Sequence, residues 1–282
     1  MAPMGASEAV PVRPGEHACC RFGRAAEGEH LAASFVRNGL TRGNKVLYLC
    51  DDELPDVAAR LESWDQRVSP AIDSGQVEVL CAQETYLPDG SFRTDRMLDR
   101  LRQAQQRATS DGYSGLSVTG EMTWALGGAV STDELIDYEH CASAVADDET
   151  LMFCQYDQSR FSQADVPAGV VLEAHSVDIA PELAAIGPLA GYVSAAAVGD
   201  VLRLAGALDF AAADVVSGVL DRHFAGEIHL DLADVDFIDV AGVRSLRGGR
   251  GRAPTIDRAS DAVVKLLSLL GWGGTTGNEE LA

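Results

Sequence analysis

The sequence predicts an α/β fold in two domains: a parallel sheet covered by helices, followed by a smaller α/β domain. From residue 17 to about residue 179, short apolar runs alternate with segments of helical periodicity, which is typical of a parallel sheet. Two runs, KVLYLC and TLMFCQY, are almost continuously apolar, as strands covered on both faces must be. The length of 282 residues fits about two domains, because an average domain has roughly 150 residues.

Five strands are expected in the first domain, each an apolar run that ends at polar or glycine-containing segments. They are His17–Phe22, Lys45–Cys50, Gln76–Cys81, Gly115–Thr119 and Thr150–Tyr156. In such sheets a ligand lies outside the carboxyl ends of the strands. The loops that follow these strands are therefore the expected binding region.

Amphipathic helices are predicted between the strands. Residues Gly28–Asn38 and Arg93–Ala108 both place apolar side chains at helical spacing. Ser131 and Glu134 form a capping-box pattern, which predicts a helix that begins there and runs to about Val145. Each of these helices can cover one face of the sheet.

The second domain repeats the alternation on a smaller scale. We expect a strand over Gly199–Gly206, and then a helix that Asp209 caps and that runs to about Phe224. Apolar and polar residues alternate over 228–232, which predicts a second strand. A last helix is predicted over Arg258–Leu270.

A segment rich in alanine, proline and glycine separates the two patterns and predicts the domain boundary. The expected layout is a tail at 1–14, a first domain at 15–180, a linker at 181–190, a second domain at 191–272 and a tail at 273–282.

The composition excludes several classes of partner. A net charge of −21 repels nucleic acids and anionic lipid surfaces, so we expect neither DNA binding nor membrane binding. The one basic cluster, at residues 244–252, is interleaved with glycines and is read as a solvated loop. No apolar run approaches the roughly 20 residues of a membrane span, and the first fifteen residues lack a signal-peptide core. A cytoplasmic location is expected.

The loop over residues 23–30 has the glycine spacing of a phosphate-binding loop, between a strand and a helix. Where that motif requires a lysine and a hydroxyl, the chain has Glu29 and His30. The spacing of Gly23 and Gly28 is either a remnant of the motif or chance. Under both interpretations tight binding of a magnesium nucleotide is disfavoured, because a carboxylate repels phosphate.

Glu121 follows the fourth predicted strand, where an ATPase would hold its water-orienting carboxylate. It is interpreted as a relic of that role, as a ligand contact together with Trp124, or as an acid in a loop beside a packing tryptophan. The sequence leaves these three alternatives open.

His17 and Cys19 lie two residues apart on the first strand and therefore share a face. A metal site needs three or four ligands, and spacing along the chain supplies only these two. We therefore expect no metal and no cofactor, and interpret His17 as a core histidine beside a buried thiol. Six cysteines without C-x-x-C pairs agree with that expectation.

An ordered set of residues over about 15–180 resembles the methanogen/methylotroph sensory domain, abbreviated MEDS. The set is His17-x-Cys19-x-x-Phe22, Glu27, Phe35-x-x-x-Gly39-Leu40, Lys45–Leu49, Gly120-Glu121-Met122-x-Trp124, Tyr138-Glu139, Cys154-Gln155-Tyr156-Asp157 and His175. The resemblance implies a sensor of small molecules such as hydrocarbon derivatives, built on a degenerate RecA-like fold. The candidate ligand-binding residues are His17, Cys19, Phe22, Glu27, Glu121, Trp124 and Tyr156.

The run LDLADVDFIDVAGVRSL resembles the signature of the STAS domain, the fold of anti-sigma-factor antagonists, over about residues 191–272. The resemblance implies a protein partner, an anti-sigma factor or switch kinase, that docks at Asp239, Val240, Ala241 and Gly242. Phosphorylated members carry a serine between that aspartate and glycine. This chain has Val240 and Ala241 there, so phosphorylation at this site is chemically impossible. The stretch 247–252 replaces an apolar strand, and a short or loose sheet edge is expected.

These observations predict a non-enzymatic signalling regulator, in which a small-molecule sensor is coupled to an antagonist-like module. A nucleotide enzyme using Glu121 and the loop at 23–30 is one alternative. A purely structural adaptor, or a module that forms a homodimer, is another.

Overall fold

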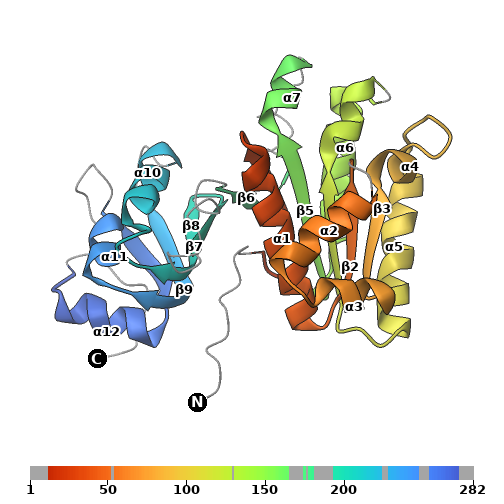
Figure 1. Ribbon diagram of the computed structural model, residues 1–282. Helices are drawn as coiled ribbons and strands as arrows, with labels where there is room; N and C mark the ends of the chain where they lie inside the picture. The colour runs from red at the N-terminus through yellow and green to blue at the C-terminus, as the bar shows by residue number, and fades with distance from the viewer. Residues whose placement is uncertain are drawn as a thin grey trace. The chain divides into compact units, whose positions relative to one another are not determined.

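The computed structural model describes residues 12–51, 54–128, 130–164, 174–175, 177–180, 193–223, 228–247 and 254–272. The chain divides into two compact units, one over Val12–Asp178 and one that includes Ile179–Ala282. We call them the first and the second unit. The predicted linker at 181–190 and the tail at 273–282 lie outside the described residues. Each unit is an α/β structure, which confirms the predicted fold class (Figure 1).

In the described part of the first unit, five parallel strands form the sheet, in the order β1-β5-β4-β2-β3. Their bounds are β1 His17–Phe22, β2 Lys45–Cys50, β3 Val77–Cys81, β4 Leu116–Glu121 and β5 Thr150–Asp157. All five were expected from the apolar runs, and the boundaries differ by one or two residues. Because β4 continues to Glu121, this carboxylate lies on the last residue of a strand rather than in a loop.

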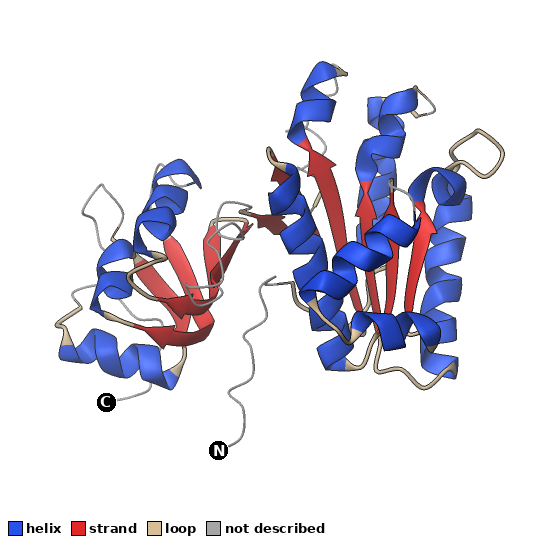
Figure 2. Cartoon of the chain, viewed as in Figure 1, coloured by secondary structure: helices blue, strands red, loops and turns tan. Residues whose placement is uncertain are grey.

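Helices cover both faces of this sheet (Figure 2). They are α1 Ala25–Arg42, α2 Leu54–Trp64, α3 Val68–Asp73, α4 Ala82–Tyr86, α5 Thr94–Ser110, the 3-10 helix η1 Met122–Gly127, α6 Thr132–Ser143 and α7 Gln158–Gln163. Buried side chains of α1, α2 and α3 form one core with β2, and those of α4, α5 and α6 form another on the opposite face. The capping box predicted at Ser131 is present, with both of its hydrogen bonds.

The residues described in the second unit form four strands in the order β10-β9-β8-β7. The elements are β7 Val193–Val198, β8 Val201–Leu208, α10 Ala213–His223, β9 His229–Ile238, α11 Val240–Ser245, β10 Thr255–Ala259 and α12 Asp261–Leu269. β7 and β8 are antiparallel, and the other pairs are parallel. A short strand, β6 Val177–Ile179, crosses the division between the units.

Three details of the second unit differ from the sequence-based expectation. The antiparallel strand β7 was not predicted, because its alanine-rich sequence carries little strand signal. The strand before the last helix is β10, which comes after the arginine-glycine stretch rather than within it. The last helix begins at Asp261 and not at Arg258, because Arg258 belongs to β10 and Ser260 occupies the N-cap position.

Within the described part of the chain, no helix combines the length and the apolar character that crossing a bilayer requires.

Candidate functional site

At the N-terminus of α1, the carboxylate of Glu27 accepts hydrogen bonds from the backbone. Glu27 Oε2 accepts hydrogen bonds from the backbone N–H groups of Gly23 and Arg24, at 3.2 and 3.1 Å. The Arg24 guanidinium donates to Glu27 Oε1 through Nε at 2.9 Å and through Nη2 at 2.6 Å. Burial opposes ionisation of Glu27, but the hydrogen bonds from Arg24 hold the pKa of this carboxyl below its ordinary value. A carboxylate of the chain itself therefore accepts hydrogen bonds from the N–H groups of Gly23 and Arg24, which a phosphate-binding loop would offer to phosphate.

Packing accounts for one of the two glycines in this loop. A Cβ atom on Gly28 would lie 2.8 Å from the ring of Phe22, so the absence of a side chain lets that ring lie against α1. Gly23 has no comparable neighbour within 4 Å. Of the residues in the lysine and hydroxyl positions, Glu29 lies 3.9 Å from Arg60, and His30 packs edge-on against Trp64.

A polar pocket of about 190 Å³ opens at the carboxyl ends of the strands. It is lined by Phe22, Ala25, Gly28, Glu29, Tyr48, Asp51, Arg60, Glu121, Thr123, Gln155, Asp157 and Arg160. Two of the predicted ligand-binding residues, Phe22 and Glu121, are therefore brought together here. Among the residues that the structure describes, its lining has four acidic and two basic side chains, which favours a neutral or cationic ligand over an anion.

Glu121 is held in a fixed orientation in the polar pocket. Its Oε1 accepts a hydrogen bond from the Tyr48 hydroxyl at 2.6 Å, and its Oε2 accepts one from the Asp51 backbone N–H at 2.9 Å. Burial and the Glu121 charge raise the pKa of Tyr48 well above its ordinary value, so the phenol remains a donor. Because a carboxylate can accept about four hydrogen bonds, Glu121 keeps capacity for a ligand.

Trp124 belongs to the hydrophobic core and does not line the polar pocket. Its ring stacks on Tyr86 with a centroid distance of 4.1 Å and an interplanar angle of 9°, and its exposed fraction is 5%. Phe92 packs against the same ring at 4.9 Å. Of the three interpretations considered for this segment, packing is the one that the geometry of Trp124 favours.

An apolar pocket of about 320 Å³ lies elsewhere in the first unit, between α5 and the strands β2, β3 and β4. Leucine, methionine and valine side chains supply most of its wall, with Arg100 and Arg107 among the other lining residues. None of the predicted ligand-binding residues lines it.

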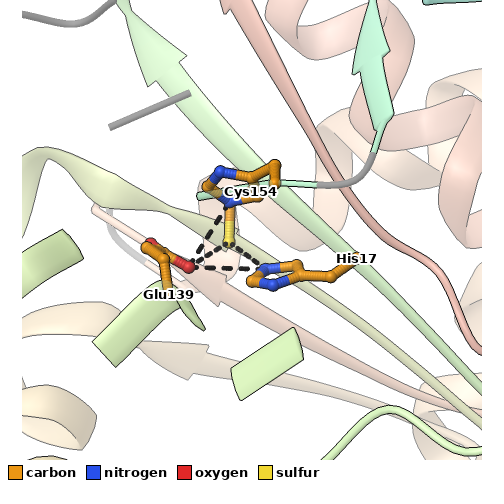
Figure 3. A group of neighbouring side chains, drawn as sticks. His17, Glu139 and Cys154 are labelled. Atoms are coloured by element: carbon orange, nitrogen blue, oxygen red, sulfur yellow. Dashed lines mark hydrogen bonds and ion pairs between the residues drawn. The ribbon is translucent and has the colours of Figure 1, made fainter. Parts of the chain in front are cut away.

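Four buried side chains converge beneath the strand ends, and we call them the donor cluster: His17, Glu139, Cys154 and His175. Their nearest ligand atoms all lie within 4.8 Å of one another. Glu139 Oε2 is 3.4 Å from Nε2 of His17 and 3.4 Å from Nε2 of His175. Cys154 Sγ is 3.2 Å from His17 Nε2 and 3.7 Å from Glu139 Oε2; Figure 3 shows His17, Glu139 and Cys154 meeting at one point.

Burial controls the protonation of the donor cluster. Burial and the neighbouring His175 lower the pKa of His17 to about 3, so this imidazole is neutral. Although burial opposes its ionisation, the neighbouring His175 and the hydrogen bond from Tyr156 lower the pKa of the Glu139 carboxyl. Burial and the Glu139 charge raise the pKa of the Cys154 thiol well above its ordinary value.

Two of the predicted residues take different parts in this arrangement. Tyr156 donates a hydrogen bond to Glu139 Oε1 at 2.7 Å, so it supports the cluster from outside. Cys19 faces Cys154 across the β1–β5 ladder and is fully buried, but it is not one of the four donors.

Spacing along the sequence could not find the donor cluster. Its members lie on β1, α6, β5 and the segment before β6, far apart in the chain. The family resemblance includes Glu139, Cys154 and His175, and the apolar run TLMFCQY predicts Cys154 only as a residue of a buried strand. The available signal was that His17 and Cys154 lie on strands that a parallel sheet can place side by side.

The second unit presents a helix start flanked by exposed apolar side chains. Asp239 caps α11, because its Oδ1 accepts from the Gly242 N–H at 2.8 Å and its Oδ2 from the Phe210 N–H at 3.0 Å. Val240 is 44% exposed, Phe237 53% and Phe210 82%. Ala241 is partly exposed and Gly242 is buried. The predicted docking residues thus include exposed apolar surface beside Asp239, whose two carboxylate oxygens already accept backbone hydrogen bonds.

Together, the two units define a two-domain α/β protein. The chain belongs to the MEDS family, because the model described as "MEthanogen/methylotroph, DcmR Sensory domain" matches residues 16–175, more than half of its length. Residues 193–278 match the model described as "Mlab, STAS domain". The predicted order of a MEDS domain and a STAS domain is therefore confirmed. A comparison with curated proteins gives no match.

Proposed function

We propose that this chain is a non-enzymatic signalling regulator. Its first unit binds a small molecule in the polar pocket, and its second unit docks an anti-sigma factor or a related switch kinase through the start of α11. One observation supports the proposal most. A polar pocket is open at the strand ends, whereas the backbone N–H groups before α1 already donate to Glu27.

The size and lining of the polar pocket support a small ligand with a polar head. Its volume of about 190 Å³ is below the roughly 300–1,000 Å³ of pockets for drug-sized molecules. Glu121 can accept a further hydrogen bond, and Phe22 offers an apolar contact. A short hydrocarbon carrying a hydroxyl or amino group matches these features, and phosphate does not.

A thermal-shift screen of the full chain with short-chain alcohols, amino alcohols and amines tests this assignment. We expect at least one compound to raise the melting temperature of the wild type, because a ligand that binds only the folded state stabilises it. Glu121→Gln removes the charged acceptor, and we expect it to weaken binding about tenfold or more.

Asp137→Asn is the matched control, because Asp137 is an exposed acid on α6 and its variant should keep the shift. If no compound stabilises the wild type, or if the shift survives Glu121→Gln, the polar pocket is not the sensing site.

The second unit supports protein docking without a phosphorylation switch. Val240 and Ala241 have no hydroxyl. Ser245, the nearby serine, is 7% exposed and its hydroxyl donates to the Gly242 carbonyl at 2.7 Å. A kinase that approaches this face finds no accessible acceptor among residues 239–245. Partner docking would then be regulated by the first unit, whose ligand must bind the docking-competent and the docking-incompetent state with different affinities.

We expect no ATP hydrolysis by the full chain with Mg²⁺. The Glu27 carboxylate adds negative charge where phosphate would bind, and no lysine or hydroxyl follows Gly28. A steady-state phosphate-release assay measures this, with Glu121→Gln as the comparison variant. Turnover near the enzyme median of roughly 10 per second, abolished by Glu121→Gln, would overturn the regulatory proposal in favour of an enzyme.

A further inference from the structure

The spacing of the donor cluster is that of ligands around one metal ion. Zinc bonds to imidazole nitrogen and carboxylate oxygen at about 2.0–2.2 Å and to thiolate at about 2.3 Å. In a tetrahedron these bond lengths place neighbouring ligand atoms roughly 3.3–3.6 Å apart. Four of the six separations among the ligand atoms of His17, Glu139, Cys154 and His175 run from 3.2 to 3.7 Å, and all six are within 4.8 Å, so a metal ion would draw the donors slightly closer together.

Hydrogen bonds outside the cluster fix which atom of His17 faces the other donors. The Ser143 hydroxyl has one proton, and two carbonyl oxygens lie near it: Glu139 O at 3.0 Å and Ala174 O at 3.4 Å. When the hydroxyl donates to the nearer carbonyl, it accepts the N–H of His17 Nδ1, which lies 2.9 Å away. His17 Nε2 then carries a lone pair, and this lone pair is directed at the cluster.

In that tautomer the direct contact between His17 Nε2 and Glu139 Oε2 is unfavourable, and a cation between the two atoms would relieve it. An unprotonated nitrogen and a carboxylate oxygen at 3.4 Å present lone pair to lone pair, in a site where both side chains have no exposed surface. The single thiol proton of Cys154 can satisfy only one of these two acceptors. A metal ion would satisfy both of them together.

The other oxygen of the carboxylate is held from outside the cluster. Tyr156 donates to Glu139 Oε1 at 2.7 Å, which leaves Oε2 directed at the two histidines. Outer hydrogen bonds of this kind, here from Tyr156 to Glu139 and from His17 to Ser143, orient metal ligands in proteins.

We propose that His17, Glu139, Cys154 and His175 bind one divalent transition-metal ion of the zinc class. Two imidazoles, one carboxylate and one thiolate suit Zn²⁺, and this mixture of ligands excludes Mg²⁺ and Ca²⁺, which take oxygen ligands. On binding, the Cys154 thiol releases its proton to solvent. The carboxylate and the thiolate then balance the charge of the ion, so the buried site is neutral. The metal joins β1, β5 and α6 to the segment that precedes β6.

Metal analysis of the full chain, produced without a histidine tag in zinc-supplemented medium, tests the proposal. We expect about one zinc ion per chain by mass spectrometry of the element. Competition with a chromophoric chelator then gives the affinity. Cys154→Ser should weaken zinc binding by about 100-fold or more, and Tyr156→Phe by about 10–100-fold, because it removes an outer hydrogen bond.

Cys19→Ser is the matched control, since Cys19 is equally buried on the neighbouring strand but is not one of the four donors. It should bind zinc within about twofold of the wild type. Loading with Co²⁺ provides a second measurement: wild type and Cys19→Ser should show thiolate-to-cobalt absorption, and Cys154→Ser should not. If Cys154→Ser fails to fold, the stoichiometry and the cobalt spectrum of the wild type still decide the matter.

Three results would overturn the proposal. They are a metal-free protein that takes up neither Zn²⁺ nor Co²⁺ on titration, a cobalt spectrum without thiolate absorption, and equal zinc affinity in Cys154→Ser and Cys19→Ser. The cluster would then be a buried hydrogen-bonding network only. Because no sensed ligand or partner is needed, these outcomes are independent of the proposed function.

Discussion

The Ala241→Asp variant is expected to lose its protein partner, with affinity reduced by about 100-fold or more. The new carboxylate lies in the first turn of α11, among the exposed apolar side chains of Val240 and Phe210. Docking against this surface would bury an unpaired charge, which costs on the order of 3 kcal/mol or more, and each 1.4 kcal/mol is tenfold in affinity. The second unit should remain folded, because a negative charge near a helix N-terminus is favourable. The measurement is capture of the anti-sigma factor or kinase by the immobilised chain, followed by titration with the captured protein.

Leu269→Asp is the matched control for this variant. Leu269 is 75% exposed on α12, so the substitution adds the same charge to the same unit on a different helix. It should bind the partner as the wild type does. Partner binding that survives Ala241→Asp, or that is lost equally in Leu269→Asp, would show that the second unit docks through another surface. Incubation with the partner kinase and labelled ATP should also leave residues 239–245 unlabelled.

Gly242→Ala should destabilise the second unit by about 3 kcal/mol or more. A Cβ atom at this position would lie 1.9 Å from the Leu208 carbonyl oxygen and 2.8 Å from its carbon, and backbone atoms at the end of a strand cannot move aside cheaply. For a domain of this size, we expect the melting transition of the second unit to fall by roughly 12 °C or more. Scanning calorimetry of the full chain measures this change.

Gly218→Ala provides the opposite case within the same unit. Gly218 lies inside α10, and a Cβ there would meet nothing within 4 Å. Replacing a helical glycine with alanine should raise stability by up to about 1 kcal/mol. If Gly242→Ala and Gly218→Ala have the same melting temperature, the close approach of α11 to Leu208 does not determine the stability of the second unit.

Local periodicity was sufficient to predict most of the architecture. KVLYLC and TLMFCQY became β2 and β5 because a continuous apolar run fits only a strand that is covered on both faces. Prediction failed where a strand sequence had low strand propensity or resembled the start of a helix. β7 is largely alanine and valine, and the last strand ends in Asp257, Arg258 and Ala259, which look like the start of a surface helix.

The sites show why sequence alone predicted some residues and not their arrangement. Phe22 ends β1 and Glu121 ends β4, on either side of β5, and strand-end reasoning predicted both at the same edge of the sheet. Glu139 lies on a helix that appeared to need only an apolar face, and His175 follows the last predicted strand of the first domain. Only the folded chain brings these two within 3.4 Å of each other. Convergence of this kind depends on helix placement, which no short-range pattern encodes.

The internal carboxylate at the start of α1 also affects how selective the protein can be inside a cell. Nucleotides are abundant competitors for any open anion site, and a sensor that shared such a site with its own ligand would report energy status instead. Glu27 forms this contact within the same helix, at a local concentration that no free phosphate can match. Restoring a lysine at Glu29 alone would not reverse this, because the Glu27 carboxylate and the Phe22 ring against Gly28 would both remain. We therefore expect the polar pocket to exclude nucleotides, and nucleotide binding to require several coordinated substitutions.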